Sequence, residues 1–324
     1  MELGVVDFCK CNINCSQPIP GDLKNVGDEI YEAFTSIGFV YLKNTGISDD
    51  EAAKVQKISK DFFDLDDNIK LKYAINENLF GYVAPGVENN DPTKPGEYKE
   101  SFDVSSQGLV SPNSRWPDGE LPGFSDTVKN FTANLRKLAF RIIQALSIGM
   151  KVKDATYLQR CHSRLNDTKN ITTLRSLYYP KIPHNYVVKE GEMRLGEHTD
   201  FGSFTILFQD FIGGLQVRRQ DGTFTEARPI PGTALVNIGD CLQFWTRGRL
   251  KSTIHRIPMP DIGGPMNQKR SSLVYFVVPD NETDLSEIDC EGIDALPQEN
   301  TEKPITALEH LRKKYEEVNL PIPN

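Results

Sequence analysis

From about Thr172 onward, short runs of β-forming residues alternate with turn signals, and this pattern sharply narrows the possible folds. The runs are LRSLYYP, FTILFQD, GGLQVRRQDGTF, TALVNIGDCLQFW, STIHRIPM and RSSLVYFVVP. One of them contains Asp221-Gly222, a dipeptide typical of tight hairpin turns. Several short strands at this spacing predict an antiparallel barrel or a double-sheet jelly roll.

The sequence before these runs has mainly helical periodicity. Apolar residues recur at intervals of three and four from Val128 to Leu146, which predicts a long helix with one buried stripe. Many Pro, Gly and Asn residues between positions 76 and 124 indicate a long polar connection, and loops of this length are often functional. The other expected elements are a strand at residues 5–8, a helix at 28–37, a strand at 39–42, and helices opened by capping boxes at 48–51 and 306–309.

These patterns together predict an α+β fold with a mainly β core, namely a jelly roll with flanking N-terminal helices and a C-terminal helix. No shift in composition separates the parts, so we expect a single domain over residues 1–324. Its expected sections are a helical N-terminal section with short strands (about 1–165), a jelly-roll core (about 166–290) and a C-terminal helical segment (about 291–324).

Charge and cysteine content restrict the expected partners. The formal net charge is -8 and the sequence has no dense Lys/Arg cluster, which argues against nucleic acid as a direct partner. No stretch reaches the roughly 18 apolar residues of a membrane span, and no signal peptide stands out. The six cysteines favour reduced thiols, although Cys9, Cys11 and Cys15 are close enough in sequence to bind a soft metal. We therefore expect a cytoplasmic protein that acts on a small molecule, with no membrane or evident protein partner.

His198 and Asp200 form a candidate metal-binding pair. Side chains at positions i and i+2 of an extended segment point to the same side, so both can bind one ion. His255 lies on a later expected strand that a rolled barrel can bring alongside. Two histidines and a carboxylate form the facial triad of non-haem Fe(II) oxygenases, which leaves positions open for a co-substrate and O₂. Taken alone, an HxD pair also suits a hydrogen-bonded loop.

Arg270 and Ser272 form a second i, i+2 pair, at the start of the last β-type run. A buried guanidinium needs an anion, and its planar fork pairs bidentately with a carboxylate, to which a serine can also donate. A dicarboxylate lying between Arg270 and the metal would fit, and Tyr179 could donate a further hydrogen bond from a neighbouring strand. An ordinary surface arginine before a strand is the alternative for Arg270 taken alone.

Several blocks follow one another in a defined order along nearly the whole chain. They are VVDF, SIGFVYLKNTGI, FFDLDDNIKLKY, GYVAPG, KESFDV, RWP, GEHTDFGSFTILFQD, GGLQV, VNIGDCLQFWTRGRLKSTIHR and RSSLVYFVVP. In this order and spacing the chain resembles the Fe(II)- and 2-oxoglutarate-dependent dioxygenases of the isopenicillin N synthase-like superfamily. The segments around the HxD pair are most similar to the fungal thymine-hydroxylase branch.

The resemblance implies a distorted double-stranded β-helix and a defined set of site residues. It implies that His198, Asp200 and His255 bind iron. It also implies that Arg270, Ser272 and Tyr179 bind the distal carboxylate of 2-oxoglutarate. Leu177 departs from the pattern, because many plant members have an asparagine there that can help to hold the co-substrate.

Substrate contacts are expected from the 76–124 connection and from side chains beside the iron. The aromatic candidates, each with core packing as the alternative, are Phe80, Tyr82, Phe102, Phe204 and Trp245. Polar recognition by either Lys99 or Asp103 is also expected. The remaining histidines lack the spacing of the triad and are expected to be surface or structural residues: His162, His184 and His310.

The activity implied by the resemblance is oxidation of a small-molecule C–H bond, usually hydroxylation, coupled to decarboxylation of 2-oxoglutarate to succinate and CO₂. The implied cofactors are Fe(II), 2-oxoglutarate as co-substrate and O₂, with ascorbate as a reductant. Three alternatives stay open at this point. They are a related iron oxidase that does not consume 2-oxoglutarate, a catalytically inactive jelly-roll binding protein, and a zinc hydrolase with the same ligands.

Overall fold

The computed structural model describes residues 3–88, 94–285, 288–290 and 305–317. Two β-sheets form its core. The large sheet has the strand order β1 (Gly4–Asp7), β2 (Phe39–Lys43), β10 (Thr233–Ile238), β7 (Phe204–Gln209), β12 (Arg270–Val277), β5 (Thr173–Tyr179), β4 (Glu100–Ser105) and β3 (Phe80–Val83). The small sheet has the order β6 (Met193–His198), β11 (His255–Pro258), β8 (Gln216–Arg218) and β9 (Phe224–Glu226).

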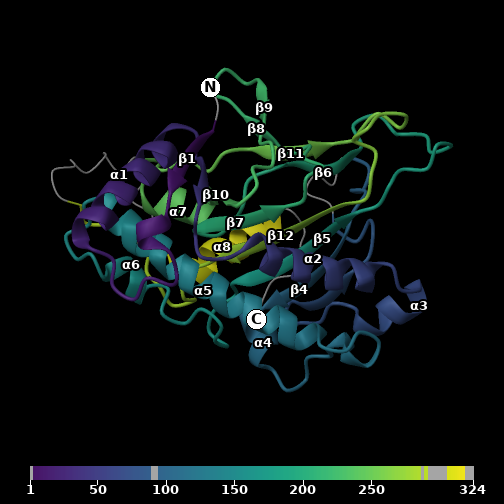
Figure 1. Cartoon of the computed structure of the whole chain (residues 1–324), viewed down its shortest axis with the longest axis horizontal. Coiled ribbons are helices and arrows are strands. Elements are labelled where there is room, and N and C mark those ends of the chain that lie inside the picture. The colour runs from purple at the N-terminus through teal and green to yellow at the C-terminus, as the bar shows by residue number, and fades with distance from the viewer. Residues whose placement is uncertain (1–2, 89–93, 286–287, 291–304, 318–324) are drawn as a thin grey trace.

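Helices surround this double sheet. The α-helices are α1 (Pro20–Ser36), α2 (Asp49–Phe63), α3 (Asp67–Lys70), α4 (Ser106–Val110), α5 (Phe124–Gly149), α6 (Tyr157–Arg160), α7 (Asp240–Trp245) and α8 (Ala307–Glu317). Short 3-10 helices occupy Cys9–Cys11 (η1), Leu71–Tyr73 (η2) and Pro117–Gly119 (η3). Figure 1 shows the small sheet on one side of the large sheet, with α2 and α5 on the other side. The predicted α+β fold with a jelly-roll core and flanking helices is confirmed.

Side chains of the large sheet alternate between two environments, as the strand period of two requires. Leu177 and Val274 pack in an apolar cluster between the two sheets. Phe102, Leu174 and Tyr275, on the opposite face, pack in the larger cluster that contains the helices. On β4 and β5 the odd-numbered side chains therefore face the space between the sheets, and this alternation decides which residues can reach a site there.

Local sequence signals account for several element boundaries. The Ser48 side chain accepts a hydrogen bond from the Glu51 backbone N–H at 3.2 Å and so caps α2. The Thr306 side chain does the same for Glu309 at the start of α8. Gly222, with φ of +84°, turns the chain between β8 and β9. Both predicted capping boxes and the predicted hairpin are thus confirmed.

The prediction of a long polar connection at residues 76–124 is wrong. This region contains β3, β4, α4 and η3, and β3 and β4 extend the large sheet beyond β5. Residues 101–105 of β4 do alternate between polar and apolar side chains, as a strand with one face in the core should. This short pattern lies among many Pro, Gly and Asn residues, which favoured the interpretation as a connection, and only the pairing of β4 with β3 and β5 reveals the strands.

His162 is a structural residue, as predicted, and is buried between α6 and β7. One ring nitrogen donates to the Leu158 carbonyl at 2.7 Å, and the other lies 2.8 Å from the Ser203 hydroxyl. Burial lowers the pKa of His162 from 6.5 to about 4. His310 is also buried and packs on Phe244, whereas His184 is exposed.

The lowered pKa of His162 makes stability depend on pH. Between pH 6.5 and 4 the unfolded chain binds a proton that the folded protein does not, so stability is complete above pH 6.5 and is lost on acidification. We expect this group to account for about 3 kcal/mol across that window. Urea denaturation at pH 7, 6 and 5 should show a shallower pH slope for His162→Gln than for the wild type. Parallel slopes would contradict this role.

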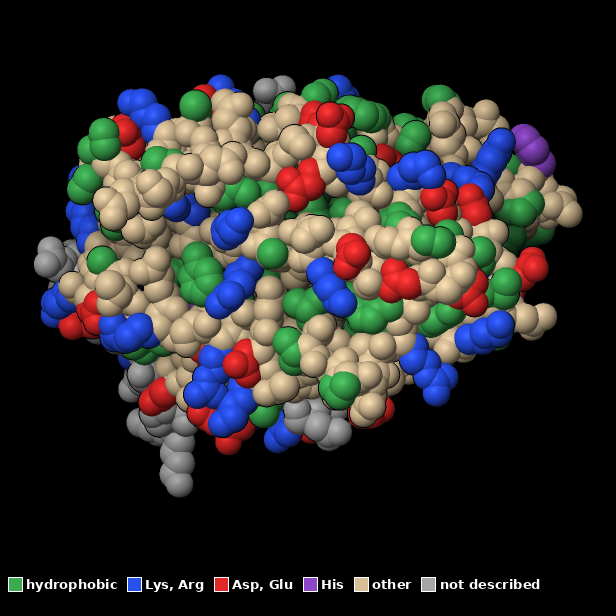
Figure 2. All heavy atoms as spheres, turned by 60° about the horizontal axis from the view of Figure 1, so that its bottom comes forward, with side chains coloured by type: hydrophobic (Ala, Val, Ile, Leu, Met, Phe, Trp, Pro, Cys, Tyr) green, Lys and Arg blue, Asp and Glu red, His purple; other side chains and the backbone are tan. Residues whose placement is uncertain are grey.

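The surface carries both signs of charge. Lys and Arg side chains are interspersed with Asp and Glu across the face drawn in Figure 2. Within the described part of the chain, no helix combines the length and the apolar character that crossing a membrane requires.

Candidate active site

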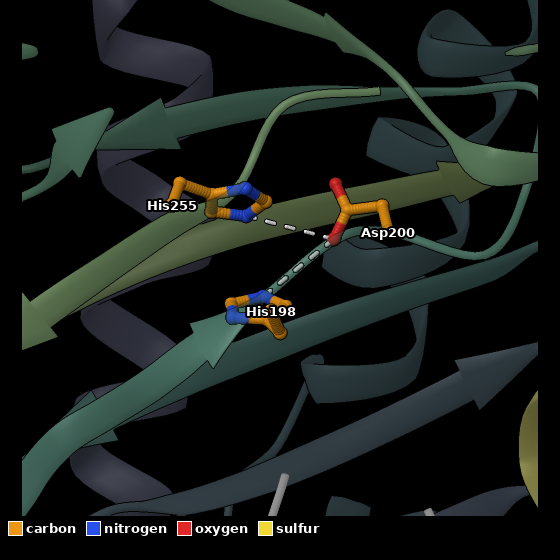
Figure 3. A group of neighbouring side chains, drawn as sticks. All are labelled: His198, Asp200 and His255. Atoms are coloured by element: carbon orange, nitrogen blue, oxygen red, sulfur yellow. Dashed lines mark ion pairs between the residues drawn. The ribbon is translucent and has the colours of Figure 1, made fainter. Parts of the chain in front are cut away.

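Two strands of the small sheet bring the predicted triad together. His198 is the last residue of β6, Asp200 follows two positions later, and His255 begins β11 directly opposite His198 in the strand register. The Nε2 atoms of both histidines lie 3.7 Å from Oδ1 of Asp200. Figure 3 shows the three side chains converging, and one candidate ligand atom from each lies within 4.8 Å of the others. The pairing of β6 with β11 therefore brings His255 next to His198, although the two residues are far apart in the sequence.

Backbone carbonyls fix the orientation of both imidazoles. Nδ1 of His198 donates to the Gly196 carbonyl at 2.8 Å, and Nδ1 of His255 donates to the Thr253 carbonyl at 3.1 Å. A carbonyl can only accept, so the proton of each neutral ring lies on Nδ1. The lone pairs on Nε2 are left facing Asp200, as in metal sites where a second hydrogen bond sets the histidine tautomer.

Asp200 is held just as firmly. Its Oδ2 accepts hydrogen bonds from the Thr205 hydroxyl at 2.5 Å and from the Asn237 amide at 2.7 Å. This leaves Oδ1 facing the two histidines. Burial alone would raise the pKa of the Asp200 carboxyl, but the two imidazoles and these hydrogen bonds outweigh it and lower the pKa.

The charge state of the triad suits a divalent cation. Burial, and then the neighbouring His255, lower the pKa of His198 from 6.5 to about 4. At neutral pH His198 thus offers a neutral imidazole nitrogen and Asp200 an ionised carboxylate, the forms that bind metals. Two nitrogens and one oxygen on one side of an ion are the donor set of non-haem Fe(II) oxygenases. The residues present therefore fit Fe(II).

Arg270 and Tyr179 offer buried polar groups without an anionic partner. Arg270 is 1% exposed, and its Nε donates to the Gly213 carbonyl at 2.7 Å. Its other nitrogens have only long contacts, 3.4 Å each, to the side chains of Ser272 and Gln209. Among the described residues no carboxylate pairs with it, and the Tyr179 hydroxyl opposite it in the register has no hydrogen-bond partner. A ligand carboxylate would satisfy both groups.

One cavity of about 380 Å³ contains both groups of residues, a volume typical of small-molecule sites. His198, Asp200 and His255 line it, as do the predicted co-substrate residues Arg270, Ser272 and Tyr179. The arrangement can hold a metal ion and a small dicarboxylate in one space between the sheets. Leu311 and Tyr315 of α8 also line the cavity, so the C-terminal helix forms part of its wall.

The structure places all five aromatic residues predicted as substrate contacts outside the cavity. Tyr82, Phe102 and Phe204 are buried in the helix-side core, because their positions on β3, β4 and β7 place them on the face away from the cavity. Trp245 ends α7 and packs in the same core beside Tyr157. Phe80, also named as a candidate, lies there too. These residues therefore pack in the core, which was the alternative to substrate contact for each of them.

Charged residues take the place of those aromatics on the cavity wall. Lys99 and Asp103, the two polar candidates, both line the cavity. Glu88 and Arg175 line it as well and were missed by sequence reasoning. Arg175 shares the odd positions of β5 with Tyr179, so the alternation along LRSLYYP could have revealed it. Glu88 lies between strands and has no comparable signal.

The comparisons with known proteins agree with this geometry. Residues 170–279 match the model of the 2OG-Fe(II) oxygenase superfamily, and residues 11–119 match that of the non-haem dioxygenase in morphine synthesis N-terminal region. The chain is 33% identical over 278 residues to the 2-oxoglutarate-dependent dioxygenase htyE of Aspergillus rugulosus, covering 78% of this chain and 82% of that protein. It is 30% identical over 281 residues to the proline hydroxylase buaE of Petromyces alliaceus, covering 81% and 84%.

Solved structures extend the match to almost the full chain. The structure of Neurospora crassa thymine-7-hydroxylase with alpha-KG and thymine has a TM-score of 0.83 and 30% identity, covering 97% of this chain and 96% of that one. This chain belongs to the 2OG-Fe(II) oxygenase superfamily. It is a 2-oxoglutarate-dependent dioxygenase, an enzyme that uses Fe(II), 2-oxoglutarate and O₂.

The hydrogen bond from Asn237 to Asp200 gives a first test of the metal site. Replacing Asn237 by alanine removes one of the two hydrogen bonds that orient the Asp200 carboxylate and should lower Fe(II) affinity by about 10- to 100-fold, the usual effect of removing a group that orients a metal ligand. Competitive metal titration of the folded variant would measure the change. Asn113→Ala, on the exposed surface, is the control. Equal affinities for both variants would contradict the orienting role.

Proposed function

We propose that this enzyme oxidises a C–H bond of a small molecule held in the cavity between the two sheets. In this proposal His198, Asp200 and His255 hold Fe(II), which supplies the oxygen chemistry when bound. The observation that carries the proposal is that one cavity joins this triad to Arg270 and Tyr179, two buried groups that lack an anionic partner among the described residues.

The residues of the chain provide binding, orientation and exclusion of water. Arg270 would receive the distal carboxylate of 2-oxoglutarate in its planar fork, with Ser272 and Tyr179 donating to the same group. The two imidazoles keep their protons on Nδ1 through the carbonyls of Gly196 and Thr253, so Nε2 stays free for the metal. The cavity walls shield the reacting centre from bulk water, which strengthens each electrostatic contact within it.

The names of relatives suggest where to begin a substrate search. One relative is a proline hydroxylase, and the Neurospora crassa enzyme was solved with thymine. Both names point to small molecules that contain a ring nitrogen. We therefore propose that this enzyme also acts on a small molecule, and that it hydroxylates the C–H bond that it attacks.

Succinate formation tests the proposed function. The protein would be incubated with Fe(II), 2-oxoglutarate, ascorbate and air, and screened with nucleobases, amino acids, and isoprenoid or phenolic acids. We expect one class to raise succinate formation above the rate without substrate, with equimolar loss of 2-oxoglutarate. Oxygen uptake without 2-oxoglutarate would favour a related iron oxidase instead. No succinate with any compound, or unchanged turnover in His198→Ala, would overturn the proposal.

A further inference from the structure

Arg194, the second residue of β6, is a buried cation that belongs neither to the metal triad nor to the lining of the cavity. It is 2% exposed, and among the described residues no carboxylate forms an ion pair with it. Its Nε is buried and has no hydrogen-bond partner in the described part of the chain. Burying a guanidinium without an anionic partner costs free energy, so packing alone does not account for an arginine at this position.

The guanidinium of Arg194 joins the two segments that present the proposed co-substrate residues. Its Nη2 donates to the Pro180 carbonyl and to the Gln268 carbonyl, at 3.0 Å each. Pro180 directly follows Tyr179, the last residue of β5. Gln268 lies two positions before Arg270, which begins β12 and is the register partner of Tyr179. Arg194 therefore holds both strands at the ends where Tyr179 and Arg270 lie.

Asn267 ties the same two segments to each other. Its side chain, 3% exposed, accepts the Ile182 backbone N–H at 2.8 Å and donates to the Ile182 carbonyl at 2.9 Å. Ile182 lies two positions after Pro180, and Asn267 directly precedes Gln268. The two segments are thus linked as one unit, and Arg194 attaches this unit to β6.

This attachment crosses from one sheet to the other. Arg194 lies on β6 of the small sheet, four positions before the triad residue His198, whereas β5 and β12 belong to the large sheet. A dicarboxylate that binds the metal at one end and Arg270 at the other must therefore span both sheets. Its two ends can bind together only if the sheets keep a fixed separation, and misplacement of reacting groups by about 1 Å can cost about 100-fold in activity.

The charge of Arg194 also favours an anion at this end of the cavity. Burial, and then the neighbouring Arg270, lower the pKa of Arg194, and Asp210 offsets only part of this effect. A guanidinium nevertheless stays protonated at neutral pH. Two cations that lie close together in the protein interior repel each other, and a carboxylate bound at Arg270 would relieve this repulsion.

From these contacts we infer that Arg194 is a positioning residue that fixes the separation between the metal triad and the groups that bind the distal carboxylate of the co-substrate. The inference rests on the proposed function, because it takes Arg270 and Tyr179 as those groups. Arg194 does not line the cavity and would not touch the co-substrate. It acts through the two carbonyls that it binds, which keep Arg270 and Tyr179 at a distance from the triad that one small dicarboxylate can span.

Two ligands distinguish this positioning role from general damage to the protein. N-oxalylglycine has a metal-chelating end and a distal carboxylate, whereas oxalate has the chelating end alone. Each would be titrated by calorimetry into the full chain loaded with Zn(II), so that no turnover is required. In Arg194→Met we expect N-oxalylglycine to bind at least about tenfold more weakly than it binds to the wild type, and oxalate to bind within about twofold of the wild-type affinity.

Arg219→Met is the matched control. Arg219 is a half-buried arginine of the β8–β9 hairpin whose Nη2 donates to the Thr225 hydroxyl at 3.0 Å, and it does not line the cavity. Its replacement should leave both affinities unchanged. If circular dichroism shows that Arg194→Met does not fold, Arg194→Lys takes its place. The lysine is shorter and lacks the planar fork, so we expect the same selective loss for N-oxalylglycine, of at least about threefold.

The outcomes separate this inference from the proposed function. Unchanged affinity for N-oxalylglycine in the Arg194 variant, or an equal loss for both ligands, would overturn the inference. Arg270→Met supplies the comparison, because it should weaken N-oxalylglycine binding whatever the role of Arg194. A loss in Arg270→Met without a loss in the Arg194 variant would refute this inference alone. Unchanged N-oxalylglycine binding in Arg270→Met, or no binding to the wild type, would refute the proposed co-substrate site and the inference with it.

Discussion

The His255→Ala variant is expected to lose 2-oxoglutarate turnover by more than about 100-fold. Mutation of a group that only orients a metal-binding side chain lowers metal affinity or activity by about 10- to 100-fold. Removal of the metal-binding side chain itself should lower activity further. Only one imidazole and one carboxylate would remain, and Nε2 of His198 and Oδ1 of Asp200 alone hold an ion weakly. Turnover would be measured as succinate formed, and bound iron by elemental analysis after desalting.

A matched histidine separates loss of the metal from general damage. His184 is exposed, and His184→Ala should keep both turnover and iron content. Circular dichroism of both variants would establish that the fold is intact. Iron content and turnover in His255→Ala equal to those of His184→Ala would contradict the assignment of the triad.

The Arg270→Met variant should raise KM for 2-oxoglutarate by about 100-fold or more, with a smaller effect on kcat. Each hydrogen bond to a charged group contributes about 1.5–3 kcal/mol, and the guanidinium can donate two to one carboxylate. Arg270 is buried without a carboxylate partner in the described part of the chain, so the co-substrate is the group expected to satisfy it. Steady-state kinetics over a range of 2-oxoglutarate concentrations would measure the change.

Two further variants define how Arg270 acts. Arg270→Lys keeps the charge but loses the planar fork, so its KM should lie between those of the wild type and Arg270→Met. Arg228→Met removes an exposed arginine and should leave KM unchanged. A KM for Arg270→Met within twofold of the wild-type value would mean that the co-substrate carboxylate binds elsewhere.

Site residues and structural elements can be predicted from the sequence where they depend on the spacing of neighbouring residues. The i, i+2 spacing of His198 and Asp200, and that of Arg270 and Ser272, is enough to place each pair on one face of an extended segment. The capping boxes, the long helix α5 and the β8–β9 hairpin also depend on neighbours in sequence. These are interactions that a few adjacent residues determine by themselves.

The sequence does not predict which residues of β3 and β4 line the cavity, because this depends on which face of each strand points inward. Tyr82 and Phe102 fall in the expected substrate-side blocks, yet the register of β3, β4 and β5 turns them toward the helices. The same register turns Lys99 and Asp103 toward the cavity. A shift of one residue would exchange the two sets, and the sequence contains no local signal that fixes pairing between distant strands.

Long-range contacts explain the remaining omissions. Glu88 reaches the cavity because Arg175, 87 positions later, binds its carboxylate. The helix α8 was expected from its capping box, but only the tertiary structure shows that Leu311 and Tyr315 complete the cavity wall. Such contacts arise from the packing of the sheets and helices, so they could not be predicted from the neighbouring sequence.

A crystal structure of the protein prepared anaerobically with Fe(II) and N-oxalylglycine tests the central claim most directly. We predict one iron ion bound by Nε2 of His198, Oδ1 of Asp200 and Nε2 of His255. The distal carboxylate of N-oxalylglycine should lie against the guanidinium of Arg270. Iron bound at another site, or a distal carboxylate bound away from Arg270, would contradict the account.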